Sequence, residues 1–379
     1  MLHKRAVFFD RDGTLLVPPA EYICKAEQVE FYPGSAESIC LLKGRGFRRI
    51  VVTNQAAVGR GMISELNLLP VHNQMKRVLA ARDADLDAVY YSPYFAAAGH
   101  PEHRRRPQDR KPSPGLFDRA AREFHISLKD SFVVGDRLED IESARAIGAK
   151  SVLVRTGKGS ETERALSGTV PDAVTDDVTG AAVWICRTAC ETPLTGKTVL
   201  FVLPGRNFQE REYLVSRLML DAWGAAIRVA GPGREECVGS QGLRVRPDVT
   251  HRQAAGEPHD AVVFVGGEGT RALADCKDCR ALARKVYEGK KILAAICVAP
   301  SILAKEHLLS GKSAVAWHTE LPLLRKMGAR VSRAAVVRDE SIVTAAGPRD
   351  AAAFAEEIRA ALLGEKKIEM TVAGRAEPA

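Results

Sequence analysis

Two carboxylates near the N-terminus have the types and spacing of a catalytic pair. Asp10 and Asp12 follow the short apolar run Ala6–Phe9, and Gly13 and Thr14 then turn the chain away. Because side chains at positions i and i+2 share one face of a strand, we expect the two carboxylates to converge. Converging carboxylates repel one another unless a cation shares their charge, and Mg²⁺ prefers oxygen ligands. The pair predicts a magnesium site with one carboxylate as nucleophile and the other transferring protons; the alternative is an acidic turn without a chemical role.

Three more polar residues follow other expected strands of the first half. Thr53 ends the apolar segment RIVVT, Lys111 lies in a loop rich in Pro and Arg, and Asp136 follows a strand ending at Val134. Strands that alternate with helices predict a parallel, doubly wound sheet, whose chemistry gathers at the carboxyl ends of the strands. A hydroxyl and backbone N–H groups at such an end suit phosphate oxygens. The pattern predicts a phosphate site in which Lys111 neutralises charge, although an Arg-Lys pair in a loop is often simply solvated.

The elements that must position these residues divide the chain into two α/β domains. In the first half, strands are expected at 6–9, 49–53, 88–91, 131–134 and 151–155, and helices at 34–46, 64–81, 114–123 and 142–147. In the second half, strands are expected at 198–203, 227–230, 260–265, 291–296 and 313–317, and helices at 209–223, 276–287 and 299–307. The predicted boundaries are a domain at 1–185, a linker at 186–196, a domain at 197–365 and a flexible tail at 366–379.

Length and composition limit the classes of protein that the chain fits. Two globular domains are expected of 379 residues, 46% of them hydrophobic. The 8 scattered cysteines indicate reduced thiols and a cytoplasmic location rather than a disulfide framework. Neither a leader nor a membrane-spanning run is recognised. The net charge of +8 is spread out and favours a small anionic partner over nucleic acid, although the basic run Arg104–Arg106 leaves nucleic-acid binding as an alternative.

The first half also resembles a known superfamily. The segments FFDRDGTL, VVTNQ, RKP and VVGDRLED resemble the four motifs of the haloacid-dehalogenase (HAD) phosphatases, and NQAAVGRG and RKPSPG resemble one branch, the D-glycero-D-manno-heptose 1,7-bisphosphate 7-phosphatases and their histidinol-phosphatase relatives. The resemblance implies a HAD-like Rossmannoid sheet and a phosphoaspartate formed on Asp10. It implies that Asp12 protonates the leaving alcohol and then activates water. The Mg²⁺ would be bound by Asp10, the Asp12 carbonyl and Asp136, with Asp140 supporting the site.

The same resemblance implies where a substrate binds. The implied substrate-binding residues are Thr53, Asn54, Arg60, Arg110 and Lys111. Members of this branch typically carry a zinc loop before the Arg-Lys-Pro motif, and its cysteine and histidine positions are here occupied by Ser92, Tyr94, Pro107 and Asp109. We therefore expect no structural zinc. Because this loop shapes substrate choice, the expected substrate is a small sugar phosphate without a commitment to heptose.

A cysteine in the second half has the position of a nucleophile. Cys297 lies between an expected strand and helix, as at a nucleophile elbow, and a helix N-terminus lowers the pKa of a thiol. Gly267 and Val298 are candidates for an oxyanion hole, and His318 is a candidate base. The alternative for Cys297 is a buried core cysteine. Two further pairs, Cys186 with Cys190 and Cys276 with Cys279, are interpreted as having no chemical role.

The second half resembles the ThiJ/PfpI family, in the segments VLFVLPGRNFQEREY, VVFVGGEGTRAL, ILAAICVAPSILA, VAWH and VTAAGP. The resemblance implies a class I glutamine-amidotransferase-like, flavodoxin-like fold, with Cys297 as nucleophile, Glu212 bonded to it and His318 nearby. The sequence departs from the family at Val298, where His is frequent, and at Gln209, where an acid is expected. The implied activities are deglycase, glyoxalase or amidase-like hydrolysis, with a homo-oligomer formed through this domain. The alternative is a non-catalytic dimerisation or redox-sensing module.

Overall fold

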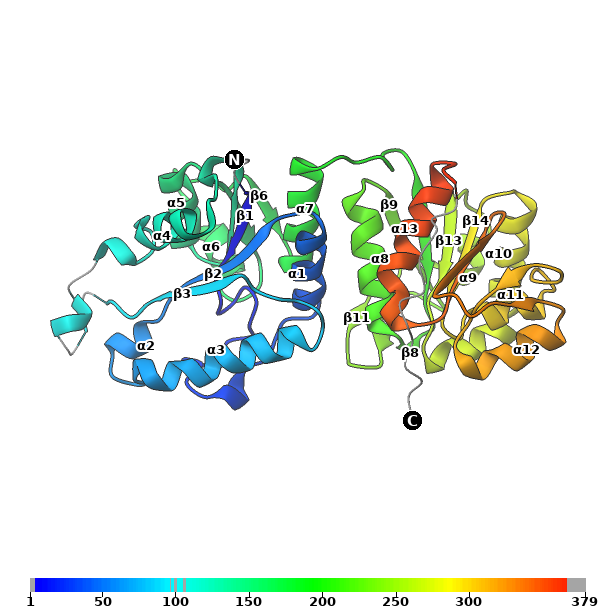
Figure 1. Ribbon diagram of the computed structural model, residues 1–379, viewed down its shortest axis with the longest axis horizontal. Coiled ribbons are helices and arrows are strands. Elements are labelled where there is room, and N and C mark those ends of the chain that lie inside the picture. Colours follow the sequence, from blue (N-terminus) through cyan, green and yellow to red (C-terminus); the bar gives the residue numbers. More distant parts are fainter. Residues whose placement is uncertain (1–3, 96, 99–100, 105–106, 367–379) are drawn as a thin grey trace. The chain divides into compact units, whose positions relative to one another are not determined.

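The computed structural model describes residues 4–95, 97–98, 101–104 and 107–366, and it divides into two compact units between Cys190 and Glu191 (Figure 1). Helix α7, Val178–Ala189, extends into the segment predicted as the linker. It does so because Ile185 and Cys186 are buried, which continues its apolar face. The predicted tail lies, apart from residue 366, outside the described residues, as do Arg105 and Arg106 of the basic run.

The first unit contains one parallel sheet whose central strand carries the acidic motif. Its strands are β1 Ala6–Phe9, β2 Arg48–Asn54, β3 Ala88–Ser92, β4 Phe132–Gly135, β5 Lys150–Val154 and β6 Ala173–Thr175. Their order is β3-β2-β1-β4-β5-β6, and every neighbouring pair is parallel. The strand order reverses between β1 and β4, which places the ends of these two strands at the site where such sheets bind ligands.

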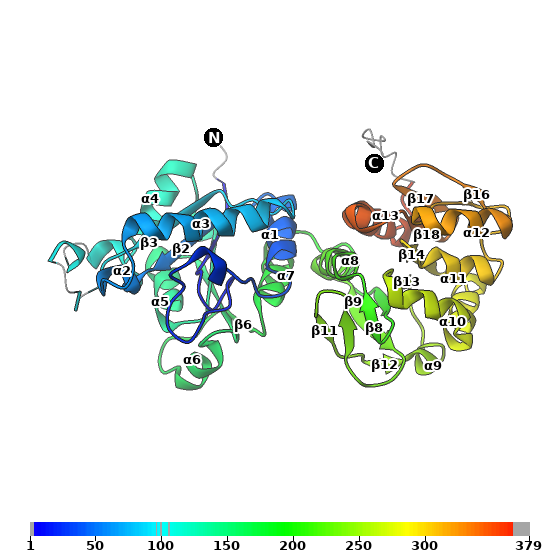
Figure 2. The same cartoon turned by 90° about the horizontal axis from the view of Figure 1, so that it is seen from below.

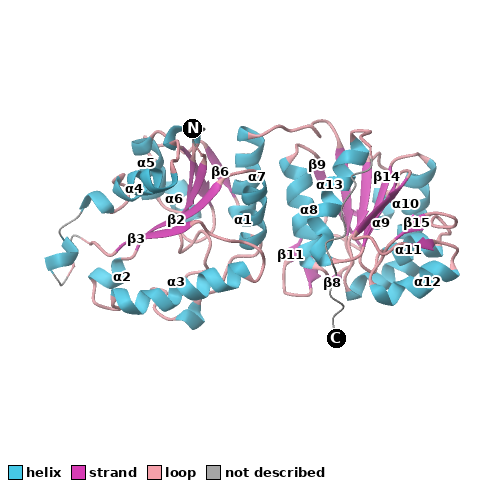
Figure 3. Cartoon of the chain, viewed as in Figure 1, coloured by secondary structure: helices cyan, strands magenta, loops and turns pink. Residues whose placement is uncertain are grey.

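Helices cover the sheet of the first unit (Figure 3). They are α1 Ser35–Gly44, α2 Ala56–Gly59, α3 Glu65–Ala80, α4 Gly115–Phe124, α5 Leu138–Ile147, α6 Gly159–Ala165 and α7, with short 3-10 helices at Ala26–Gln28, Pro101–Arg104, Pro107–Asp109 and Leu128–Asp130. On one face, Phe8 packs edge-on against Phe117 of α4, with ring centroids 5.1 Å apart. Soon after β2 comes the short helix α2, whose residues Ala57 and Val58 are buried.

The second unit contains a seven-stranded sheet. Its strands are β7 Thr198–Val202, β9 Ala226–Gly231, β12 Val249–Thr250, β13 Ala261–Phe264, β14 Ile292–Ile296, β17 Val336–Asp339 and β18 Ile342–Ala345. Their order is β12-β9-β7-β13-β14-β18-β17, parallel except for the pair of β17 with β18. Small sheets are formed by β8 Arg206–Phe208, β10 Cys237–Gly239 and β11 Arg244–Val245, and by β15 Ser313–Ala314 and β16 Arg330–Val331. The strand expected at 313–317 is therefore wrong in length and does not join the main sheet.

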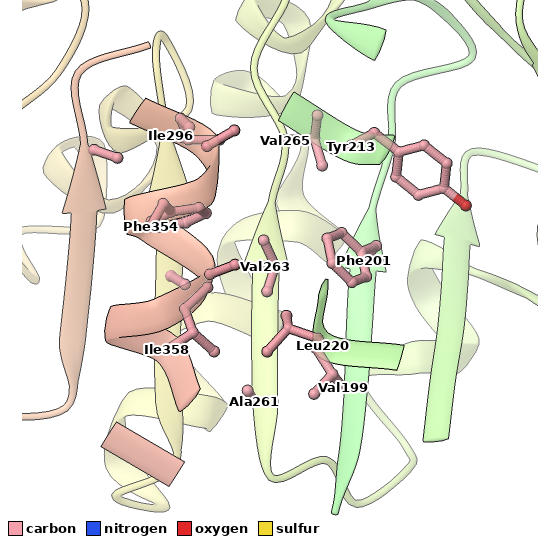
Figure 4. Close-up of a cluster of buried hydrophobic side chains, with 14 of the residues drawn as sticks. Val199, Phe201, Tyr213, Leu220, Ala261, Val263, Val265, Ile296, Phe354 and Ile358 are labelled. Atoms are coloured by element: carbon pink, nitrogen blue, oxygen red, sulfur yellow. The ribbon is translucent and has the colours of Figure 1, made fainter. Parts of the chain in front are cut away.

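Helices lie on both faces of this sheet (Figure 2). They are α8 Glu210–Ala222, α9 His251–Ala254, α10 Lys277–Glu288, α11 Pro300–Lys305, α12 Leu321–Lys326 and α13 Ala351–Leu362, with 3-10 helices at Glu268–Asp275, His318–Glu320 and Pro348–Asp350. On one face, side chains of α8 and α13 such as Leu220 and Phe354 pack onto Phe201 and Val263 (Figure 4). Helices α10 and α11 supply the opposite core. The two doubly wound α/β folds predicted from the sequence are confirmed, and no helix within the described part of the chain combines the length and apolarity needed to cross a membrane.

Candidate active sites

Four charged residues of the first unit meet at the carboxyl ends of β1 and β4. Asp10 follows β1, Asp136 follows β4, Asp140 lies in the first turn of α5, and Lys111 comes from the loop before α4. One carboxylate oxygen from each of the three acids lies within 4.8 Å of the others, and all three acids are buried. The Lys111 Nζ lies 2.8 Å from Asp10 Oδ1 and 2.6 Å from Asp140 Oδ1. Two of the three clustered acids, Asp10 and Asp140, therefore share a single buried ammonium.

Lys111 forms no ion pair with Asp136, so the negative charge of Asp136 is not balanced by this lysine. Its Oδ2 accepts a hydrogen bond of 2.7 Å from the Lys158 backbone N–H. Its Oδ1 is buried and finds no hydrogen-bond partner in the described structure. Burial, reinforced by the charge of Asp10, raises the pKa of Asp136 to about 7. A divalent cation fits this cluster, because it would satisfy the orphaned oxygen and balance the third carboxylate.

The Asp12 carboxylate is not among the three whose oxygens lie within 4.8 Å of one another, although Asp12 lines the same cavity as Asp10. Arg11 Nε is 2.8 Å from Asp12 Oδ1, Arg11 Nη2 is 2.9 Å from Oδ2, and Gln55 Nε2 donates to Oδ2 over 3.1 Å. The fully buried guanidinium of Arg11 also lies 3.1 Å from His72 Nε2. Arg11, Gln55 and His72 were not recognised in the sequence, because their role depends on contacts between separate segments. They fix the Asp12 side chain, leaving its carbonyl for the metal role that the resemblance implies.

Two predicted substrate-binding residues, Thr53 and Asn54, form hydrogen bonds with other residues of the site. The Thr53 hydroxyl accepts a hydrogen bond of 3.0 Å from Gln55 Nε2. Asn54 donates to the Lys111 carbonyl and accepts from the Lys111 N–H, each over 3.1 Å. This pair of hydrogen bonds joins the end of β2 to the loop that carries Lys111. Asn54 therefore positions the buried lysine as well as lining the site.

A cavity of about 490 Å³ opens over these residues. Its lining includes Thr53, Asn54 and the acidic cluster, together with Arg60 and Arg110. Both guanidinium groups stack on Phe95, at 4.7 Å for Arg60 and 5.6 Å for Arg110 from the ring centroid. Phe95 was not singled out in the sequence, since a lone aromatic in a Pro-rich loop gives no signal. The cavity thus has an acidic floor and two fixed cations on its wall.

Cys297 of the second unit lies at a sharp turn between β14 and α11. Its φ of +64° is in the left-handed region, and its backbone is held by hydrogen bonds to Ala345 and Trp317. The thiol hydrogen-bonds the Glu212 carboxyl, whose Oε2 accepts from the Gly266 N–H over 2.9 Å. The backbone groups of Gly267 and Val298 also hydrogen-bond the thiol. The two predicted oxyanion-hole residues thus converge on the predicted nucleophile.

Burial dominates the protonation of this pair of side chains. Burial raises the pKa of Glu212 to about 8. Burial and the neighbouring Glu212 raise the pKa of Cys297, and the backbone hydrogen bonds from Val298 and Gly267 offset only part of that rise. The expectation that the helix N-terminus lowers the pKa of the Cys297 thiol is therefore wrong. The helix that follows, α11, has 6 residues and cannot outweigh the loss of solvation.

His318 is not part of this arrangement. It is exposed at the start of the 3-10 helix His318–Glu320, and its ring centroid lies 5.0 Å from that of Trp317. Within the described residues, neither a hydrogen bond nor a charge interaction joins it to Cys297 or Glu212. Gln209, the other noted departure, caps α8 by accepting from the Arg211 N–H.

Comparisons with known proteins match both units. Family profiles match at residues 197–361 for the DJ-1/PfpI family and 108–181 for a HAD-hydrolase-like family. A D-glycero-beta-D-manno-heptose-1,7-bisphosphate 7-phosphatase of Escherichia coli O6:H1 is 36% identical over 190 residues, which cover 50% of this chain and 92% of the relative. The N-terminal half belongs to the HAD-like hydrolases, and the C-terminal half, here called the DJ-1/PfpI unit, matches the DJ-1/PfpI family over residues 197–361. Its match to the HAD-like hydrolases and to this phosphatase identifies the HAD-like unit as a phosphoric monoester hydrolase.

Two solved structures each cover one half of the chain. The D,D-heptose 1.7-bisphosphate phosphatase of B. bronchiseptica, complexed with magnesium and phosphate, is 27% identical and covers 49% of this chain and 99% of its own, with a TM-score of 0.44. A ThiJ/PfpI domain protein from Brachyspira murdochii is 29% identical and covers 45% of this chain and all of its own, with a TM-score of 0.43.

Gly13 of the HAD-like unit has no side chain, and the Asp136 carboxylate occupies the space that a side chain would fill. Its φ is +87°, and a Cβ built there would lie 2.3 Å from Asp136 Oδ2. We expect Gly13→Ala to weaken Mg²⁺ affinity about 10- to 100-fold, because it displaces a proposed ligand. Isothermal titration calorimetry with Mg²⁺ measures the affinity of each variant. Gly46→Ala is the matched control, since Gly46 has a φ of +80° and open space around its Cβ position; equal losses in both variants would contradict the prediction.

His72 of the HAD-like unit links stability to pH. Burial and the neighbouring Arg11 lower the pKa of His72 from 6.5 to about 3. Below pH 6.5, His72 is protonated in the unfolded chain but stays neutral in the folded chain. The free energy of unfolding therefore falls as pH drops. We expect a loss of about 2 kcal/mol between pH 6.5 and 5.

The measurement is hydrogen exchange of peptides from the HAD-like unit in increasing urea, at a series of pH values. His72→Gln should flatten the stability profile between pH 6.5 and 5. His125→Asn, which alters an exposed histidine, is the control and should retain the slope of the wild type. A wild-type profile that is already flat would contradict the prediction.

Proposed function

We propose that the HAD-like unit is a Mg²⁺-dependent phosphomonoesterase that hydrolyses a small sugar phosphate through a phosphoaspartate on Asp10. The observation that carries this proposal is the cluster of Asp10, Asp136 and Asp140 in the lining of the cavity, with Lys111 paired to Asp10 and Asp140. The donor set is made of hard oxygens, and one of them lacks any partner, which suits Mg²⁺.

The residues of the chain divide the reaction into two displacements. A carboxylate oxygen of Asp10 attacks phosphorus, and the bond from phosphorus to the leaving oxygen breaks while Asp12 gives that oxygen a proton. Asp12 then takes a proton from water, which attacks phosphorus, so that phosphate leaves and Asp10 is restored. Lys111 neutralises charge on Asp10 and on the phosphoryl oxygens. Mg²⁺, when bound by Asp10, Asp136 and the Asp12 carbonyl, balances the negative charge of the phosphoryl group.

The residues in the wall of the cavity favour a substrate that is a polyol with a second anionic group. Arg60 and Arg110 are held against Phe95, and Arg110 Nη1 donates to the Tyr94 carbonyl over 2.7 Å. A guanidinium fixed in this way loses little conformational entropy when it binds an anion. The E. coli relative is named for a heptose bisphosphate, and a substrate of that class agrees with two cations facing the acidic floor.

The test is a phosphatase assay of the purified chain, with Mg²⁺ and after treatment with EDTA. The panel contains heptose 1,7-bisphosphate, hexose phosphates, histidinol phosphate and nucleoside monophosphates. We expect Mg²⁺-dependent turnover that is fastest on a sugar phosphate. Turnover that is unaffected by EDTA, or that is confined to nucleotides, would contradict the proposal.

For the DJ-1/PfpI unit we propose cysteine-dependent hydrolysis of the deglycase or glyoxalase type. The supporting observation is the convergence of Gly267, Val298 and Glu212 on the Cys297 thiol. Because His318 is exposed and is not among the groups that act on the thiol, Glu212 is the candidate proton carrier. We expect Cys297→Ala to abolish release of lactate from methylglyoxal while leaving phosphatase activity unchanged.

The rival proposal is that this unit serves dimerisation or redox sensing. It predicts that Cys297→Ala retains wild-type turnover in every assay and that removal of the unit converts a homodimer into a monomer. Sedimentation of the full chain and of residues 1–190 decides between these outcomes.

A further inference from the structure

The fold of the DJ-1/PfpI unit brings a histidine to a Cys-x-x-Cys pair. His251 is the first residue of α9, Cys276 immediately precedes α10, and Cys279 lies in the first turn of α10. One ligand atom from each side chain lies within 4.8 Å of the other two. His251 and Cys279 are buried, and Cys276 is half-buried. Helices α9 and α10 lie side by side in two orthogonal views (Figures 1 and 2).

The histidine is oriented as a metal ligand would be. Its Nε2 lies 2.9 Å from the carbonyl oxygen of Leu203, which follows β7, so Nε2 carries the proton and donates it. The ring also has a backbone hydrogen bond to Ala230, and the nitrogen that is not protonated is the candidate ligand atom. Metal-binding histidines characteristically donate their other ring N–H to a carbonyl in this way.

The two thiols face each other at the start of a 12-residue helix. The Cys276 and Cys279 side chains are hydrogen-bonded to one another, and Cys279 is buried. A buried thiolate needs a cation, which a metal ion would supply. A disulfide uses only the two thiols, whereas a metal ion uses the neighbouring imidazole as a third ligand. The histidine therefore favours a metal site over a redox pair.

We propose that His251, Cys276 and Cys279 bind a transition-metal ion of the borderline or soft class, with Zn²⁺ as the ion that suits them best. Two thiolates and one imidazole are ligands that select Zn²⁺ over Mg²⁺ or Ca²⁺. Binding replaces the two thiol protons by two metal–sulfur bonds and releases both protons to solvent. Three protein ligands would leave one position of a tetrahedral ion for water or another ligand. This site is independent of the phosphatase proposal.

Cobalt(II) is the probe that tests the site, because its absorption spectrum depends on which atoms bind it. The full chain is reduced, freed of metal with a chelator and titrated with Co²⁺. We expect one equivalent to give thiolate-to-cobalt charge-transfer absorption in the near ultraviolet, and Zn²⁺ to abolish it by displacement. Co²⁺ held by the carboxylates of the HAD-like unit gives no such band, so the two sites are distinguished. Zn²⁺ binding should release two protons per ion in a weakly buffered solution.

Substitutions assign the band to the three residues. Cys276→Ser and Cys279→Ser should each remove it, and His251→Gln should weaken Zn²⁺ binding about 10-fold or more. Cys237→Ser is the matched control, since Cys237 is a buried cysteine of the same unit that lies outside the cluster. Circular dichroism checks that each variant is folded. Absence of the band in the wild type, its survival in folded Cys276→Ser, or a Cys276–Cys279 disulfide persisting under reducing conditions would overturn the proposal.

Discussion

Replacement of Asp10 by Asn is expected to reduce the phosphatase kcat by about 10⁴-fold or more, which is the scale seen when an enzyme loses its nucleophile. The Asn amide fills the same volume but does not form a phosphoaspartate. Asp10 is buried, and its Oδ1 contacts the Lys111 ammonium, so the substitution also removes one ion-pair partner. Steady-state kinetics on the best substrate of the panel measures the loss, with mass spectrometry of the acid-quenched enzyme for the phosphorylated intermediate.

The control for this prediction is another aspartate of the same unit. Asp176 has a side chain that is 88% exposed and pairs with Arg155 at the surface. Asp176→Asn should change kcat by less than about twofold, because exposed ion pairs contribute little. Full activity in Asp10→Asn would end the assignment of Asp10 as nucleophile, and with it the proposed two-step reaction.

Replacement of Lys111 by Met is expected to damage both stability and activity. The side chain is buried between Asp10 and Asp140, and the two carboxylates raise the pKa of the ammonium against the effect of burial. Removing one partner from a buried ion cluster leaves the remaining charges unpaired, at a cost of about 3–5 kcal/mol. We also expect a loss of about 10²-fold or more in kcat, because a fixed cation next to the nucleophile is absent.

Two further variants separate the effect on stability from the effect on chemistry. In Lys111→Met/Asp140→Asn, one of the unpaired acids is neutralised, so part of the lost stability should return while turnover stays low. Lys129→Met replaces an exposed lysine of the same unit and should leave both quantities unchanged. Urea unfolding and kinetics are measured on all three chains. A Lys111→Met chain that unfolds at the same urea concentration as the wild type would contradict the ion-pair argument.

Much of the HAD-like site was predictable because it depends on local sequence. An apolar run before Asp10 and another before Asp136 indicate two buried parallel strands, and in a doubly wound sheet the ends of such strands meet. The structure places Asp10, Lys111 and Asp136 together as those patterns indicate. The two α/β folds followed from the same alternation of strands and helices.

The contacts of Asp12 were not predictable in the same way. Alternation along a strand indicates that Asp12 shares a face with Asp10, but it ignores the competing cation. Arg11, which is adjacent in sequence, turns back onto Asp12 because Gln55 and His72 bury and hold its guanidinium. Those two partners come from β2's end and from α3, so only the packed structure shows them.

By itself, the sequence determined the order of strands and helices and which acids end the strands, because both follow from periodicity over a few residues. Tertiary structure alone decided what depends on burial and on distant partners. Burial overrides the helix N-terminus at Cys297, and His318 stays in solvent. His251 reaches Cys276 and Cys279 only because α9 packs beside α10. The free energy of a buried charge is set by its whole surroundings, whereas a sequence motif specifies only its neighbours along the chain.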